Sequence, residues 1–115
     1  MLHEAWVAEC DAARSARAAN DLEAEWRHLE RAHILSQPMA RAHVRTHVAM
    51  LGSAVRRRDL REVGGQVFRL IVAGPGSLTG RYPVGNTGGA DVSAFKPMEI
   101  PEDLRAVLES ARQPK

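Results

Sequence analysis

Residues 29–51 read LERAHILSQPMARAHVRTHVAML, and the architecture of the chain follows from this segment. Apolar residues recur every three or four positions on both sides of Ser36-Gln37-Pro38, which is the spacing of an amphipathic α-helix. Because the residue before a proline is pushed out of the helical region, one helix must stop near Leu35. Another helix then runs from about Met39 to Arg57. The stretch therefore predicts two antiparallel helices joined by a tight turn.

The same spacing continues outward from this turn in both directions. A helix is expected from Leu2 to about Ala19, and Asp21 is suited to cap the helix that ends at Leu35. On the other side, Asp59 is suited to cap a fourth helix, along which Val63, Val67, Leu70 and Ile71 recur. Gly74-Pro75-Gly76 is expected to end that helix. The first 73 residues are therefore predicted to be a bundle of four helices.

The two halves of this bundle look like one motif used twice. Asn20-Asp21-Leu22 and Arg58-Asp59-Leu60 lie 38 residues apart, and Pro38 and Pro75 lie 37 apart. This arrangement resembles tetratricopeptide-type helical hairpins over residues 5 to 75. Two such units are fewer than the roughly three that a free-standing array needs. We therefore expect either a homodimer or a tail that packs on the bundle.

The remainder of the chain is rich in glycine and proline. Residues 74–100 are predicted to form an ordered loop packed on the bundle, followed by a C-terminal helix over residues 101–112. Proline at the first helical position and acidic residues in the first turn favour this helix. Its Leu104, Val107 and Leu108 are expected to dock on the bundle. The predicted fold class is all-α, with residues 1–115 forming a single domain.

Composition limits the classes of function. The chain has 115 residues, a size typical of one domain, and a formal net charge of only +2. Arg56-Arg57-Arg58 is expected to be a solvated helix end, so nothing favours a nucleic-acid partner. A single cysteine, the lack of a long apolar run and an N-terminus unlike a signal peptide predict a cytoplasmic protein that does not enter membranes.

Histidines are concentrated around Pro38. Four of the five, at positions 28, 33, 43 and 47, lie within 20 residues. His43 and His47 stand at i and i+4, so a helix places both imidazoles on one face. Glu30 and His33 form a Glu-x-x-His pair on the preceding helix, an arrangement used by metal sites in helical bundles.

A hairpin centred at residue 38 brings these two pairs together. His33 is then expected to face His43, and Glu30 to approach His47. His28 lies on a different face of its helix. The prediction is a Glu/His3 metal site made of Glu30, His33, His43 and His47.

The surroundings and the ion follow from the same register. Trp26 and Met50 lie one further turn along each helix and should form an apolar floor beneath the site. Nitrogen and oxygen ligands without a thiolate suit a divalent transition metal, namely zinc, iron, manganese, nickel or copper, and do not select among them. A hydrogen-bonded network of neutral histidines and glutamic acid is the alternative that requires no metal.

The chain also resembles a family of short bacterial proteins catalogued as a domain of unknown function. The segments LERAHILSQP, HVRTHVAML and GNTGGADVSAFKPMEIPEDL carry this resemblance, which extends over nearly the whole chain. It implies that the histidine-bearing hairpin and the Gly-Asn-Thr-Gly segment at residues 85–88 belong to one domain. The resemblance implies no activity.

Three functions are compatible with these observations. The leading hypothesis is a small metal-binding helical protein, either a metalloenzyme or a metal carrier. The second is a tetratricopeptide-like interaction module without metal. The third is a metal-free enzyme that acts on a small molecule through a Glu30–His47 or Glu30–His33 acid–base pair, with the Gly-rich loop as a lid.

Overall fold

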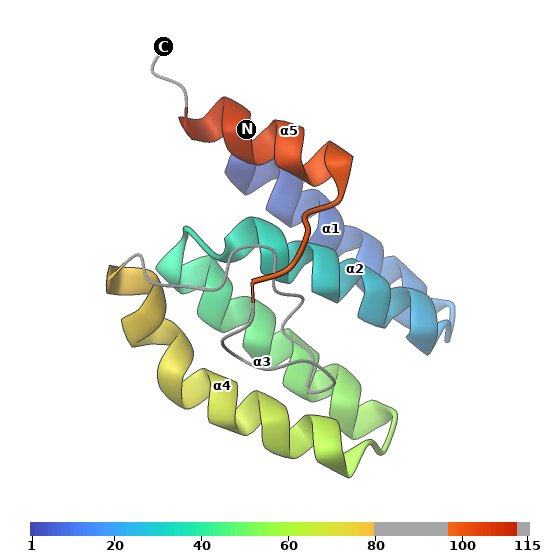
Figure 1. Cartoon of the computed structure of the whole chain (residues 1–115). Helices are drawn as coiled ribbons and strands as arrows, with labels where there is room; N and C mark the ends of the chain where they lie inside the picture. The colour runs from blue at the N-terminus through green and yellow to red at the C-terminus, as the bar shows by residue number, and fades with distance from the viewer. Residues whose placement is uncertain (80–96, 113–115) are drawn as a thin grey trace.

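The computed structural model describes residues 1–79 and 97–112, which form five α-helices and, within these ranges, no strand (Figure 1). The helices are α1 (Leu2–Ala18), α2 (Leu22–Ser36), α3 (Ala40–Arg56), α4 (Leu60–Thr79) and α5 (Glu102–Arg112). The all-α prediction is confirmed. None of the helices in the described ranges is both long and apolar enough to cross a membrane.

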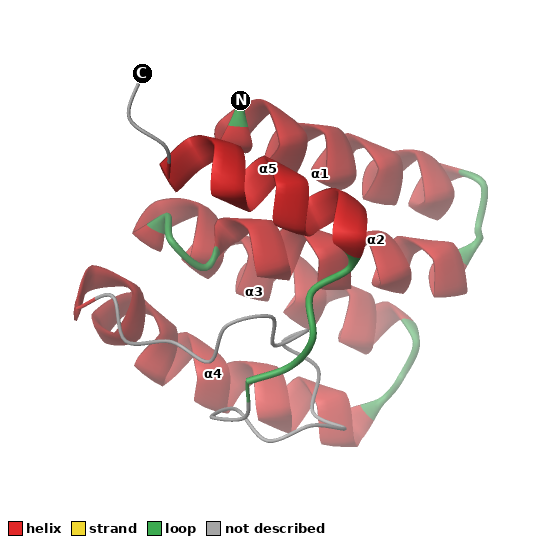
Figure 2. Ribbon diagram, turned by 45° about the horizontal axis from the view of Figure 1, so that its top comes forward, coloured by secondary structure: helices red, strands yellow, loops and turns green. Residues whose placement is uncertain are grey.

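The helices are arranged as two hairpins with a fifth helix on one side. The α1–α2 and α3–α4 pairs pack closely, and α2 also packs on α3, so the four helices form a sequential array (Figure 2). The C-terminal helix α5 lies against α1 and α2. Helix α4 therefore packs against α3 alone among the described helices.

The two inter-helix turns of these hairpins have the same geometry. Asn20 and Arg58 both adopt the left-handed conformation, with φ of 58° and 57°. The residue after each donates its backbone N–H to a carbonyl five residues earlier, from Asp21 to Ala16 and from Asp59 to Ala54, as in a Schellman motif. The 38-residue repeat in the sequence is thus a repeat of one turn structure.

Each aspartate then caps the next helix, as predicted. The Asp21 carboxylate accepts the backbone N–H of Ala24 at 3.1 Å, and Asp59 accepts that of Glu62 at 3.0 Å. These contacts satisfy N–H groups that have no partner inside the helix. They fix where α2 and α4 begin.

The apolar core has two parts. The larger lies between α1, α2, α3 and α5 and the smaller between α1, α2 and α3. The buried members of the larger are Trp6, Ala32, Ile34, Leu35, Ala42 and Leu104, and those of the smaller are Ala13, Leu29 and Met50. The Trp6 indole N–H donates to Thr46 Oγ1 at 2.9 Å, which ties α1 to α3.

Helix α5 docks as the sequence predicts. Leu104 is buried, and Val107 and Leu108 pack partly buried against the same core. Arg31 on α2 pairs with Glu9 on α1 and with Asp103 at the start of α5. The hydrogen bond from Arg31 lowers the pKa of the Asp103 carboxyl below its usual value. The C-terminal helix is therefore held by apolar packing and by one bridging arginine.

The predicted end of the fourth helix is wrong. Helix α4 continues through Gly74-Pro75-Gly76 to Thr79, so the segment after the bundle begins six residues later than expected. Proline fixes φ at a helical value, and a glycine before it has no Cβ to clash with the proline ring, so this Gly-Pro pair is tolerated within the helix. Most of the predicted ordered loop, residues 80–96, lies outside the described residues.

The arginine run at the end of α3 is not the solvated surface that the sequence suggested. Arg56 forms an ion pair with the buried carboxylate of Glu25, and the Arg57 guanidinium lies 4.3 Å from the Trp26 ring centroid. Both arginines are partly buried, whereas Arg58 is exposed. Two of the three cations therefore join α3 to the first turns of α2.

Candidate metal centre

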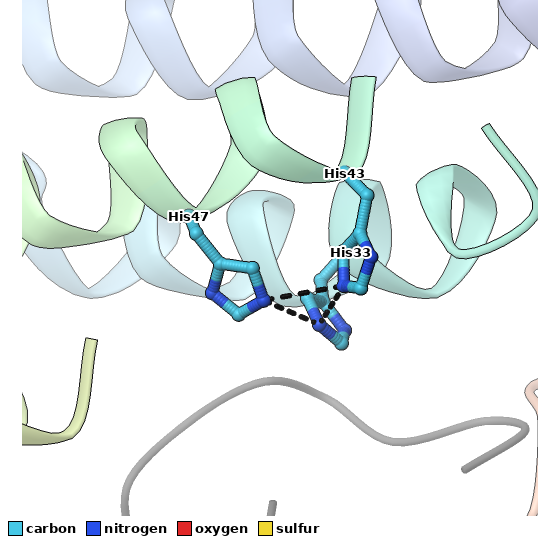
Figure 3. A group of neighbouring side chains, drawn as sticks. All are labelled: His33, His43 and His47. Carbon is cyan, nitrogen blue, oxygen red and sulfur yellow. Dashed lines mark hydrogen bonds between the residues drawn. The ribbon is translucent and has the colours of Figure 1, made fainter. Parts of the chain in front are cut away.

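Three buried histidines meet between α2 and α3. His33 lies in the last turns of α2, and His43 and His47 stand one turn apart on α3 (Figure 3). Their side chains are only 3%, 6% and 2% exposed. The three Nε2 atoms are separated by 3.0 Å (His33–His43), 3.1 Å (His33–His47) and 3.2 Å (His43–His47). The imidazoles of the His33–His43–His47 cluster thus direct one nitrogen each toward a common point.

The turn at Ser36-Gln37-Pro38 explains why they meet. It folds α3 back along α2, and the residues on either side of it come into register, as the sequence predicts for His33 and His43. Ser36 is fully buried, and its hydroxyl donates to the His33 carbonyl at 3.0 Å. This bond holds the end of α2 where the His33 ring is placed.

Glu30, the fourth predicted ligand, and His28, which was predicted to lie elsewhere, are placed outside the cluster. Glu30 is partly buried one turn before His33, but the ligand atoms that converge within 4.8 Å of one another are those of the three histidines alone. Its role as a ligand stays a prediction. His28 lies on another face, as expected, where its Nδ1 is 3.0 Å from Glu9 Oε1 on α1.

The nitrogen spacing suits a metal ion. Zinc is bound by histidine at about 2.0–2.1 Å, so tetrahedral geometry requires ligand nitrogens about 3.3 Å apart. The three observed separations, 3.0 to 3.2 Å, are slightly shorter than this. Small side-chain rotations would admit an ion without moving the helices.

Helix α4 supplies a polar contact to this cluster. The Nδ1–H of His47 donates to the amide oxygen of Gln66 at 2.6 Å, and the amide nitrogen of Gln66 donates to the Glu62 carboxylate at 2.8 Å. A carboxylate only accepts, so the Gln66 amide must turn its oxygen toward His47. Neutral His47 then carries its proton on Nδ1 and a lone pair on Nε2.

Burial favours the neutral forms of His43 and His47. Desolvation lowers the pKa of His43 to about 4, with a smaller contribution from the nearby His47. Desolvation also lowers the pKa of His47, although the Gln66 hydrogen bond acts in the opposite direction. Neutral imidazoles have the free lone pairs that metal coordination requires.

An apolar layer lies beneath the cluster, as predicted. Met50 lies one turn beyond His47 on α3. It is fully buried and packs with Leu29 and Ala13. Trp26 is partly buried against the same group. This layer limits access of water from that side.

The sequence did not reveal the contribution of α4. Its recurring valines suggested an apolar inner face, yet Val67 is exposed and the buried residues include Glu62, Gln66 and Arg69. These three polar residues stand at i, i+4 and i+7, so they share one face of the helix. That spacing, within a helix whose remaining residues are largely apolar, was the signal available.

A protein family matches nearly the whole chain. Residues 1–108 match a family described as "Protein of unknown function (DUF3703)". The chain belongs to this family. Neither the curated proteins nor the solved structures contain a match to the chain, so the resemblance to tetratricopeptide-type hairpins has no support from them.

Proposed function

We propose that this DUF3703 protein binds one divalent transition-metal ion through the Nε2 atoms of His33, His43 and His47. The observation that carries the proposal is the closed triangle of nitrogens within 3.0–3.2 Å of one another. In the absence of a cation, hydrogen bonding cannot satisfy such a triangle.

The reason is one of counting. Each Nε2 is either an N–H donor or a lone-pair acceptor. Three Nε2 atoms share two possible states, donor and acceptor, so at least two of the three atoms must be in the same state. The contact between those two atoms then places two lone pairs or two N–H groups against each other. This holds for every combination of tautomers and protonation states. A cation coordinated by three lone pairs removes the conflict, which favours metal over the purely hydrogen-bonded network.

The donor set indicates the class of ion. Three neutral imidazoles suit zinc, copper, nickel or iron better than the hard ions magnesium and calcium, which prefer oxygen. Three protein ligands leave one position of a tetrahedral ion for water or a small ligand, as in catalytic zinc sites. Coordination by Glu30, our predicted fourth ligand, would instead close the site, as in a structural or carrier protein.

The metal-free acid–base hypothesis receives less support. A general base works best when its pKa is near the working pH. Burial lowers the pKa of His43 to about 4 and lowers that of His47 as well, in the direction away from neutrality. Such histidines are weak bases toward protons but remain available as metal ligands.

Zinc titration of chelator-treated protein tests the proposal. Calorimetry should give one ion per chain, and His33→Ala and His47→Ala should each lose at least tenfold in affinity. His3→Ala and His28→Ala are the matched controls, since both histidines lie outside the cluster, and they should bind as the wild type does. Equal zinc binding by wild type and His47→Ala would refute the site.

Glu30→Gln separates the two forms of the site. A carboxylate ligand lost in this variant should weaken zinc binding by roughly tenfold or more, comparable to the loss of an outer-shell partner. An unchanged affinity would assign the fourth position to water. In either case the three-histidine site is judged by the histidine variants alone.

A second candidate function is self-association through α4. Leu60 is 83% exposed and Val67 is 47% exposed, and with Gly64 between them they occupy one stripe at i, i+4 and i+7. Among the described residues, a Cβ added at Gly64 would have open space beyond its own helix. A second copy of the chain, the predicted homodimer, would cover this stripe. Light scattering of the wild type and of Val67→Glu tests it, because the charged variant should shift any dimer toward monomer.

A further inference from the structure

Helix α4 buries polar residues while some of its apolar residues are exposed. Glu62, Gln66 and Arg69 are each at most 6% exposed. Burying such groups costs free energy unless they are paired, so their presence requires a reason. The contacts of the first two residues lead to the histidine cluster.

We propose that Glu62 and Gln66 are positioning residues which select the nitrogen that His47 presents to the metal ion. This inference rests on the proposed metal-binding function. It adds that these two residues raise the affinity of the site for the metal ion. The two residues form a directed chain, in which Gln66 donates to Glu62 at 2.8 Å and accepts from His47 at 2.6 Å.

The direction of this chain follows from the chemistry of its ends. The Glu62 carboxylate has no proton to donate when ionised, so it binds the NH2 side of the Gln66 amide. Only the carbonyl side of the amide is then left for His47, and only an N–H on Nδ1 can meet it. Neutral imidazole has one N–H, so Nε2 keeps its lone pair.

The opposite orientation would block the site. Without the carboxylate, the Gln66 amide is able to turn and donate to Nδ1. The His47 proton would then lie on Nε2 and point into the triangle, where the ion must bind. Before zinc could bind, the Gln66 amide would have to turn back and the His47 proton would have to move from Nε2 to Nδ1. Outer-shell partners of metal-binding histidines typically contribute 10- to 100-fold in affinity, and we expect a loss in this range.

The test begins with the tautomer of His47 in metal-free protein, read from its ¹⁵N chemical shifts. The wild type should show Nδ1–H. Glu62→Leu and Gln66→Leu should give a mixture or the Nε2–H form and bind zinc 10- to 100-fold more weakly. Arg61→Gln, at an exposed neighbouring position of α4, should match the wild type in both measurements.

A swapped variant controls for packing. In Glu62→Gln combined with Gln66→Glu, the new amide at 62 donates to the new carboxylate at 66, which accepts from His47. Charge, size and the direction of the last hydrogen bond are retained, so the Nδ1–H tautomer and zinc affinity should be restored to within about tenfold of the wild type. The tautomer of His47 is the readout that a purely structural role of the pair would not change.

The outcomes separate the two proposals. An Nε2–H tautomer in metal-free wild type, or wild-type tautomer and affinity in Gln66→Leu, would overturn the positioning role even if zinc binds. An Nδ1–H tautomer that depends on Gln66, in a protein that does not bind zinc, would support control of the tautomer and refute the metal site.

Discussion

Acid should destabilise the metal-free protein through His43. The imidazole is 6% exposed, and burial lowers its pKa from 6.5 to about 4. In the unfolded chain the same group has its ordinary value. Between these two values the unfolded state binds more protons than the folded state. The free energy of unfolding therefore falls as the pH falls from about 6.5 toward 4.

The two pKa values set the size of this effect. Between pH 7 and pH 4.5, protonation of His43 in the unfolded state lowers the free energy of unfolding by about 2.5 kcal/mol. His47 should contribute in the same direction, because burial lowers its pKa too. For a small domain with a total stability of about 5–15 kcal/mol, this is a large fraction.

Urea unfolding at pH 7 and pH 4.5, with a chelator present, measures the loss. Carboxylates also titrate in this range, so the comparison is with His43→Gln, which keeps a polar side chain but cannot be protonated. The pH-dependent loss should be smaller in this variant by about 2.5 kcal/mol. His3→Gln, at an exposed position, should behave as the wild type does. Equal losses in wild type and His43→Gln would refute the reasoning.

Three further predictions concern the scaffold. Arg58→Asn should raise the free energy of unfolding by about 1 kcal/mol, because Arg58 has a φ of 57° and asparagine tolerates the left-handed region better; no gain over Arg61→Asn in urea unfolding would contradict this. Met50→Ala should cost about 2–5 kcal/mol, because Met50 is fully buried beneath the cluster, and a loss no greater than that of exposed Val48→Ala would show that the layer is not tightly packed. Leu104→Ala should loosen α5, which hydrogen exchange would detect as faster exchange in α5 than in α2; unchanged exchange in α5 would argue that the Arg31 bridge suffices to hold it.

Several features could be predicted from the sequence because they depend on local rules. Apolar spacing defined the helices, Asp21 and Asp59 marked two helix starts, and Pro38 marked the turn that folds α3 onto α2. Given this turn, the register placed His33 against His43. The i, i+4 spacing placed His47 on the same face. The histidine cluster was therefore predictable from a single hairpin.

Two other features were not predicted from the sequence. A Gly-Pro pair often ends a helix, but α4 runs through Gly74-Pro75 to Thr79. Similarly, Arg56 and Arg57 looked like solvated charges until α2 placed Glu25 and Trp26 beside them. Local sequence patterns do not show which residues of a neighbouring helix will pair with these arginines.

The all-α fold, the helix hairpins and the meeting of three imidazoles follow from periodicity and turn chemistry, which act over a few residues. The side of α4 that faces inward depends on packing between helices. The apolar pattern favoured a valine face, whereas packing buries Gln66 against His47 and Glu62 against Gln66. The physical reason is that a buried polar group is stable only with a specific partner, and that partner exists only once α3 and α4 are side by side.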